Sequence, residues 1–289
     1  MMKDILIILA CVPLYVINSF CDKIVSSKEQ NRYNYFYNAV KFLICSICML
    51  PMLIFEKKPV FAVGCLFCGI FCGIMYVISK TIMLKGYEKT SVAFMTLCHS
   101  SGMILPCIIG HFFWSEKLTV ISIFGVLLAI LSIVLLKGGN EKNKKFNVKG
   151  FGFGIIVFLT SAGVMIAQKL MGIYFAEQSI SAYNFYSFVI PFLILCCFVR
   201  PKQLSGGEKG NKQLTCICAL GSAISLCVIS FVMTILSGSV PSVILFPLFN
   251  GLGIIFVCIG SAFAFKEKLT LKMLIGLALG VIGLCLINL

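Results

Sequence analysis

WSEKLT, at residues 114–119, recurs as FKEKLT at residues 265–270, 151 positions further along the chain. The flanking sequence matches in the same order, at an offset of 150 or 151 residues. The matched positions include Gly125 with Gly276, Gly102 with Gly253, Ser91 with Ser242, Ser79 with Ser230, and the Tyr-Asn pairs at 33–34 and 183–184. Chance matches of Leu or Ile are common in an apolar chain, but collinear matches of this kind are not. The sequence therefore predicts an internal duplication.

The composition predicts an integral membrane protein. Of the 289 residues, 60% are hydrophobic and 12% are charged, and the mean hydropathy is +1.06. A soluble domain has about a quarter of its residues charged, so this chain lacks a water-facing exterior. Apolar stretches close to the roughly 20 residues that cross a bilayer core are predicted as spans. They cover residues 4–25, 33–55, 60–84, 90–113, 119–137, 150–174, 181–199, 213–236, 241–264 and 270–288.

Two five-helix repeats of opposite orientation are predicted, because each repeat contains an odd number of spans. Residues 1–138 form the first repeat, 139–149 the connecting loop and 150–289 the second repeat. The predicted fold class is an all-α integral membrane protein with ten transmembrane helices. Inverted repeats are frequent in secondary transporters, where the substrate binds near the membrane midplane between the halves.

The EKLT elements carry a family resemblance. Each lies between the fourth and fifth predicted helices of its half and is followed, six residues after its Thr, by a glycine (Gly125, Gly276). This arrangement resembles the EamA-like family of the drug/metabolite transporter superfamily. The resemblance implies a carrier whose helices one to four and six to nine line the cavity. Near the position where that family commonly carries a proline, this chain has Gly102 and Gly253, and the resemblance does not name the substrate.

Polar residues inside the predicted spans are the candidates for substrate binding. His99 lies nine residues into the fourth span, which places it about 13 Å deep, near the midplane. The residue that matches His99 at an offset of 151 residues is Asn250. Ser100 lies beside His99. The alternative role for this pair is a hydrogen-bonded contact between helices. Further candidates are Asn18, Gln168, Tyr76 and Lys41.

The charges within the spans favour some substrates over others. Lys80 and Lys169 lie near enough to helix ends to reach the interface, whereas Lys41 lies eight residues into its span. Because no Asp or Glu is expected at mid-membrane depth, the predicted substrate is a small polar metabolite, neutral, zwitterionic or anionic. Amino-acid-like and nucleobase-like compounds fit this description, and the predicted mechanism is alternating access. The alternative is an exporter of organic cations or drugs.

Other functional classes are disfavoured by the sequence. An intramembrane enzyme would need a motif such as HExxH or GxSxG, or a buried carboxylate pair. The 16 cysteines lie mostly in apolar runs, so we expect packing roles, no metal site and no cofactor. The net charge of +14 comes mainly from lysines between the spans and does not indicate nucleic-acid binding. The predicted partners are a small-molecule substrate and membrane lipids, and a homodimer stays open.

The distribution of positive charge bears on orientation. Loops on the side of the termini carry 4 Lys or Arg residues, and those on the other side carry 17. The positive-inside rule therefore places the termini outside the cell membrane, in which we expect this multi-pass protein to reside. The family resemblance implies cytoplasmic termini instead. A C-terminal reporter that is active only in the cytoplasm decides between the two.

Overall fold

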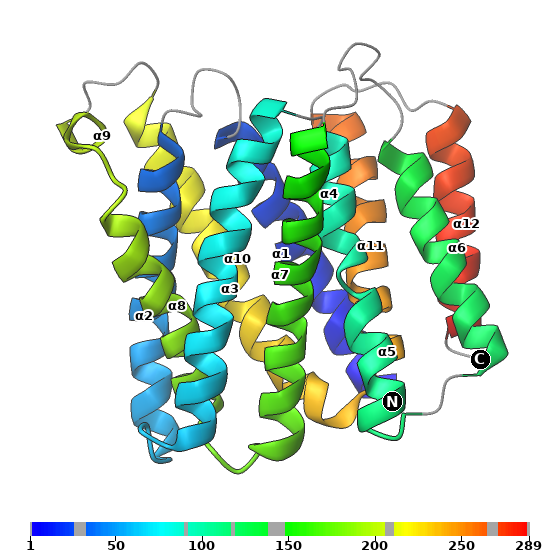
Figure 1. The fold of residues 1–289 in the computed structure, drawn as a ribbon, viewed down its shortest axis with the longest axis horizontal. Coiled ribbons are helices and arrows are strands. Elements are labelled where there is room, and N and C mark those ends of the chain that lie inside the picture. Colours follow the sequence, from blue (N-terminus) through cyan, green and yellow to red (C-terminus); the bar gives the residue numbers. More distant parts are fainter. Residues whose placement is uncertain are drawn as a thin grey trace. The chain divides into compact units, whose positions relative to one another are not determined.

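The computed structural model describes residues 2–25, 33–89, 92–116, 119–137, 148–205, 211–264 and 271–287. In these ranges the chain is helical, with turns between the helices and no strand (Figure 1). The helices are α1 (Met2–Val25), α2 (Asn34–Glu56), α3 (Val63–Lys89), α4 (Val92–Ser101), α5 (Ile104–Phe113), α6 (Val120–Lys137), α7 (Val148–Tyr174), α8 (Ile180–Cys196), α9 (Pro201–Ser205), α10 (Lys212–Ser239), α11 (Ser242–Ala264) and α12 (Leu271–Ile287).

Several of these helices have the length and composition of membrane spans. Among the described residues, five stretches are long and apolar enough to cross a bilayer: Lys3–Val25, Asn34–Glu56, Val63–Met83, Gly150–Tyr174 and Lys212–Ser239. Shorter apolar helices cover Cys98–Phe113, Val120–Ser132, Ile180–Cys196 and Ser242–Val257. The chain is therefore an all-helical, multi-pass membrane protein, as its composition predicts. That it crosses the membrane ten times stays a prediction.

The chain divides into two compact units. Unit 1 comprises Met1–Val16, Thr81–Ile166 and Val240–Leu289, and unit 2 comprises Ile17–Lys80 and Ala167–Ser239. The helices α1, α3 and α7 contribute a part to each unit. Each unit thus combines segments from both halves of the sequence.

In unit 2, α2 packs against α8 and α10. The core between them contains Phe42, Cys45 and Phe188, which are fully buried. The helix α3 approaches α8 closely because Gly69 faces it. A Cβ atom at Gly69 would lie 2.9 Å from the carbonyl oxygen of Tyr183 and 2.7 Å from the Cβ of Tyr186. Glycine thus permits helix contacts that a larger residue would obstruct.

In unit 1, α6 packs against α12, and α11 contacts both of them. The sequence predicts one span over residues 90–113, but the structure has a break there between α4 and α5. At the break, the backbone N–H of Gly102 donates to the carbonyl of His99, three residues earlier, at 3.3 Å. A Cβ at Gly102 would clash with Ser161 Oγ and lie 2.9 Å from the Phe158 carbonyl on α7. The chain therefore approaches α7 closely at the break.

Candidate functional site

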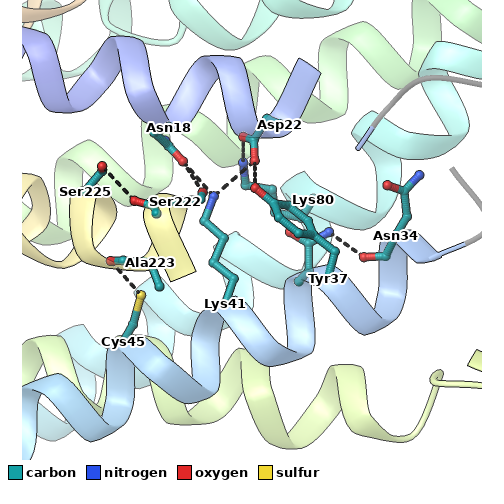
Figure 2. A network of polar contacts seen from close by, with 12 residues as sticks. Asn18, Asp22, Asn34, Tyr37, Lys41, Cys45, Lys80, Ser222, Ala223 and Ser225 are labelled. Carbon is teal, nitrogen blue, oxygen red and sulfur yellow. Dashed lines mark hydrogen bonds and ion pairs between the residues drawn. The ribbon is translucent and has the colours of Figure 1, made fainter. Parts of the chain in front are cut away.

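A buried lysine is at the centre of a polar network in unit 2 (Figure 2). Lys41 on α2 has no exposed side-chain surface. Its ammonium donates to Asn18 Oδ1 at 2.8 Å and to Asp22 Oδ1 at 3.2 Å, both on α1. The ring of Tyr37, one turn earlier on α2, lies 5.6 Å from the same nitrogen. A charge inside apolar helices is costly unless it is paired, and these contacts provide the pairing.

The carboxylate of Asp22 accepts bonds from three side chains. Tyr37 donates its hydroxyl to Oδ1 at 2.6 Å, in addition to the bond from Lys41, and Lys80 on α3 contacts Oδ2 at 3.4 Å. Asp22 has 34% of its side chain exposed and Lys80 has 19%. Two ammonium groups surround one carboxylate, so these three ionisable side chains carry one excess positive charge.

A fourth helix contributes to the same network. Ser222 on α10 donates its hydroxyl to Asn18 Oδ1 at 2.5 Å, so this oxygen accepts from both Lys41 and Ser222. The neighbouring residue, Ala223, accepts a bond from the thiol of Cys45 at 3.3 Å. The network therefore links α1, α2, α3 and α10. The network lies close to the end of α1 and the start of α2.

The structure adds partners to charged residues within the spans. The sequence predicts no carboxylate at mid-membrane depth, and Asp22, which it does not single out, lies three residues before the end of α1 and pairs with two lysines. That Lys80 reaches the membrane interface stays a prediction, and in the structure its ammonium contacts Asp22. The attraction between opposite charges inside a helix bundle offsets part of the hydration energy that each loses on burial. Lys169, for which interfacial exposure is also predicted, is only 2% exposed.

A second polar network in unit 2 is uncharged. Gln168 on α7 donates from Nε2 to Ser230 Oγ on α10 at 3.5 Å. Ser230 in turn donates to Asn184 Oδ1 on α8 at 2.6 Å. All three side chains are buried. Of the residues predicted to bind substrate, Asn18 and Lys41 are thus hydrogen-bonded to each other. Gln168 belongs to the second, uncharged network.

The predicted pair His99 and Asn250 lies in unit 1. His99 is half-buried near the end of α4, and the adjacent Ser100 is fully buried. Asn250 on α11 is 4% exposed and donates from Nδ2 to the Phe246 carbonyl of its own helix at 2.9 Å. This internal bond satisfies one amide hydrogen of Asn250. Binding of substrate by the pair stays a prediction.

Tyr76 lies in an aromatic cluster of unit 2. Its ring centroid is 5.7 Å from that of Phe42 on α2 and 6.4 Å from that of Phe188 on α8. The rings of Phe42 and Phe188 are 6.3 Å apart. Tyr76 precedes Lys80 by one turn of α3, so this apolar cluster borders the charged network. Its predicted role in binding substrate remains a prediction.

The first EKLT element joins two helices of unit 1. Glu116 accepts the backbone N–H of Ser242 at 2.8 Å and its hydroxyl at 3.3 Å, which caps the start of α11. Thr119 Oγ1 accepts the N–H of Ser122 at 3.0 Å and caps α6. A carboxylate and a hydroxyl at helix N-termini are both stabilising. The second element, residues 265–270, lies outside the described residues.

A similar cap occurs in unit 2. Glu56, at the end of α2, accepts the backbone N–H groups of Ile180 and Ser181 at 3.1 and 3.0 Å. It also accepts the hydroxyl of Ser179 at 2.8 Å. Both glutamates therefore belong to the first half of the sequence and cap a helix of the second half. No sequence signal pointed to Glu56, because a glutamate at the end of a span is expected to face water.

The thiols that the structure describes are in packing positions. Cys65 and Cys68 are buried, and Cys65 Sγ donates to the carbonyls of Val60 and Ala62 at 3.3 and 3.1 Å. The 14 cysteines whose side chains the structure describes are free thiols. Within those ranges, no group of three or more His, Cys, Asp or Glu side chains is placed to hold a metal ion.

Comparisons with known proteins address the family and the fold. The model of the EamA-like transporter family matches residues 1–137. The chain is 30% identical over 81 residues to a Bacillus subtilis (strain 168) protein named uncharacterized transporter YxxF, and the match covers 28% of this chain and 26% of that protein. It thus spans about a quarter of the curated relative's length. A solved protein crystal structure superposes with a TM-score of 0.78 over 99% of this chain and 96% of the other, at 12% identity. At that identity the likeness concerns the fold alone.

Proposed function

We propose that the chain is a secondary transporter of small polar metabolites, on the premise that its residues 1–137 match the EamA-like transporter family. It acts in the cell membrane by alternating access. Amino-acid-like and nucleobase-like compounds are its proposed substrates. The observation that carries the proposal is the network around Lys41, in which four apolar helices place charged and hydrogen-bonding side chains together.

A packed apolar protein without a polar ligand gains little stability from such a network. A hydrophobic replacement of a buried ion pair is often as stable as the pair itself, so the pair is weak evidence for a purely structural role. Intramembrane ionisable residues more often mark substrate or ion pathways. The partial exposure of Asp22 and Lys80 supports this interpretation, since charged groups are not stable against lipid tails.

Alternating access is supported by the pairing of helices within the units. The helices α2 and α8 pack together in unit 2, and α6 and α12 pack together in unit 1. At an offset of about 150 residues, each pair consists of matching helices from the two proposed repeats. Contact between matching elements is the arrangement that a pseudo-twofold axis generates. Two halves related in this way exchange conformations when the carrier changes the side to which it opens.

The charge of the network favours metabolites over organic cations. Asp22 is a partly exposed carboxylate, which is the feature that an exporter of cations would use. Both of its oxygens already accept bonds from ammonium groups or the Tyr37 hydroxyl. The excess positive charge of the network repels a further cation. The alternative function, export of organic cations or drugs, is therefore the weaker proposal.

Uptake into proteoliposomes tests the proposed function. Purified protein is reconstituted, and the entry of radiolabelled amino acids, nucleobases and tetraethylammonium is compared with entry into protein-free liposomes. We expect accumulation, or exchange with preloaded substrate, for at least one neutral, zwitterionic or anionic metabolite. Transport of tetraethylammonium alone would replace the proposal with the alternative.

The same assay tests the predicted site at His99 and Asn250. If their side chains bind the substrate, His99→Ala and Asn250→Ala should each weaken apparent affinity by about 5- to 150-fold, the loss expected for one unpaired hydrogen bond of about 1–3 kcal/mol. Lys117→Ala is the control, because Lys117 lies in the connecting element and should affect expression rather than affinity. Unchanged affinity and rate in both variants would mean that the two residues only hold helices together, and the binding site would then be assigned to the Lys41 network alone.

A further inference from the structure

The two lysines of the network have different environments. Lys41 has no exposed side-chain surface and donates to both Asn18 and Asp22, and the Tyr37 ring lies against its ammonium. Lys80 is 19% exposed, and its contact with Asp22, at 3.4 Å, is the longest of the three lysine contacts. Lys41 is thus held from several sides, and Lys80 from one.

The ammonium of Lys80 can donate more hydrogen bonds than it donates within the network. An ammonium group carries three N–H bonds. Within the described ranges of the chain, the bond to Asp22 is the one that Lys80 makes. Asp22 in turn is already neutralised by Lys41 and accepts the hydroxyl of Tyr37 at 2.6 Å. The excess positive charge of the network therefore belongs to Lys80.

Among the charged side chains of the network, the exposed surface lies on Lys80 and Asp22. Lys80 is 19% exposed and Asp22 34%, whereas Lys41 is fully covered, so of the two lysines Lys80 is the one open to a solute. A cationic solute meets an excess of positive charge, and a neutral one leaves that charge uncompensated. An anionic group neutralises the excess positive charge and accepts hydrogen bonds from the remaining N–H groups of Lys80. Such hydrogen bonds are charge-assisted.

We propose that Lys80 binds the carboxylate of the transported substrate, and that Lys41 neutralises Asp22 so that Lys80 remains available. This assignment rests on the proposed transport function and narrows its substrate class to small organic acids and zwitterions. Asp22 has a second role in this arrangement. It competes with the substrate for Lys80, because it is the carboxylate that Lys80 contacts when no substrate is bound.

Binding to purified protein in a neutral detergent tests the proposal. The probes are three pairs of near-isosteric acids and amides: lactate with lactamide, nicotinate with nicotinamide, and glutarate with glutaramide. Binding is measured as the rise in unfolding temperature with probe concentration. We expect at least one acid to stabilise the wild-type protein and its amide to have no effect. Equal shifts by an acid and its amide, or no shift by any acid, would overturn the assignment.

Variants then separate Lys80 from the rest of the network. Lys80→Gln should raise the Kd of the acid by about 10- to 150-fold, the range for a hydrogen bond to a charged group. Lys80→Arg keeps the cation and should retain binding. Asp22→Asn removes the competing carboxylate and should lower the Kd severalfold, whereas damage to a purely structural ion pair would raise it. Lys85→Gln is the matched control, because Lys85 is an exposed lysine of the same helix.

The Arg and Gln variants at Lys80 keep the test decisive even if Asp22→Asn fails to fold. An anionic lipid headgroup offers the same chemistry as an organic acid, so the assay is repeated with phosphatidylglycerol in place of the acids. Stabilisation by that lipid alone would overturn the assignment to substrate. Unchanged acid binding in Lys80→Gln would do the same.

The binding experiments and the transport assay can fail separately. Acid binding that depends on Lys80, without uptake of any compound, would leave the anion site in place and remove the transport function. Uptake of a neutral metabolite that is unaffected by Lys80→Gln would leave the transport function in place and remove the anion site.

Discussion

The two polar networks of unit 2 use matching helices but differ in charge. One joins Asn18 on α1 to Lys41 on α2, and the other joins Gln168 on α7 to Ser230 on α10. At the offset of the proposed duplication, Asn18 matches Gln168. The charged residues match uncharged ones: Asp22 corresponds to Gly172, Lys41 to Pro191 and Lys80 to Phe231. Within these two networks, the charged side chains therefore come from helices of the first half.

Packing explains why the second half does not hold a carboxylate at the matching position. A Cβ atom at Gly172 would lie 2.6 Å from the backbone nitrogen of Gly238, because α7 and α10 touch there. On α1 the corresponding place holds a side chain with three partners. The comparison shows that a duplicated helix arrangement can keep its contacts in one half and acquire a charged site in the other.

The largest expected effect concerns Lys41. Replacing it with Met removes the fully buried partner of Asp22 and leaves Lys80 and Tyr37 to hold the carboxylate. Breaking a buried ion pair costs about 3–5 kcal/mol, and because Asp22 is partly exposed we expect a loss of about 2–3 kcal/mol in the free energy of unfolding. Denaturant unfolding of the purified protein in micelles measures the loss.

Two further variants interpret that result. The double variant Lys41→Met with Asp22→Asn should lose less stability than the sum of the two single changes, since neither the Lys41 ammonium nor the Asp22 carboxylate is left without the other. Lys80 loses Asp22 in the double variant as it does in the single Asp22→Asn variant. Lys58→Met is the control, because this half-exposed lysine bonds to the Gln178 carbonyl outside the network. If Lys41→Met is no more harmful than the control, the charged network does not stabilise the fold and the comparison loses its energetic basis.

A smaller loss is expected at Gly172. The change to Ala places a methyl group against the backbone of Gly238 and should lower the free energy of unfolding by about 1–3 kcal/mol, the usual cost of overpacking. Gly152→Ala is a matched control on the same helix, since nothing lies within 4 Å of a Cβ added there. The control should be neutral or slightly stabilising. A tolerated Gly172→Ala would show that packing does not exclude a carboxylate from the second half.

The smallest loss is expected at Gln168. Replacement by Met keeps the length of the side chain and removes its 3.5 Å contact with Ser230. Neutral hydrogen bonds between membrane helices contribute about 0.6 kcal/mol on average, so the free energy of unfolding should fall by less than about 1 kcal/mol. A loss equal to that of Lys41→Met would mean that the uncharged network is as important to stability as the charged one.

The sequence predicts the helices well and the charged site only in part. Apolar runs near the length of a bilayer core define the ends of the long helices to within a few residues, because burial in lipid depends on local composition. The break at Gly102 escapes this reasoning, since it depends on the close approach of α7. Lys41 is identified as a candidate because a lysine so far inside a span requires a partner.

The partner itself was missed for a physical reason. Asp22 lies three residues before the end of α1, where a carboxylate is expected to face water. Its role depends on α2 and α3 reaching the same end of the unit, which a single segment of sequence does not encode. One signal was available, because Lys41 and Lys80 in apolar segments both require a negative charge. Among the acidic residues before residue 50, Asp22 is the one that lies inside a predicted span near these ends, because Asp4 lies at the opposite end and Glu29 lies between the spans.

The glutamate caps have a consequence for how the chain is made. Glu56 is translated well before Ser179–Ser181, and Glu116 well before Ser242, the groups that they cap. When α8 and α11 leave the ribosome, the acceptors for their first N–H groups have therefore already been synthesised. The reverse order would leave those helix ends without their caps during insertion. Synthesis in this direction means that the first half supplies the capping groups before the helices that they cap are made.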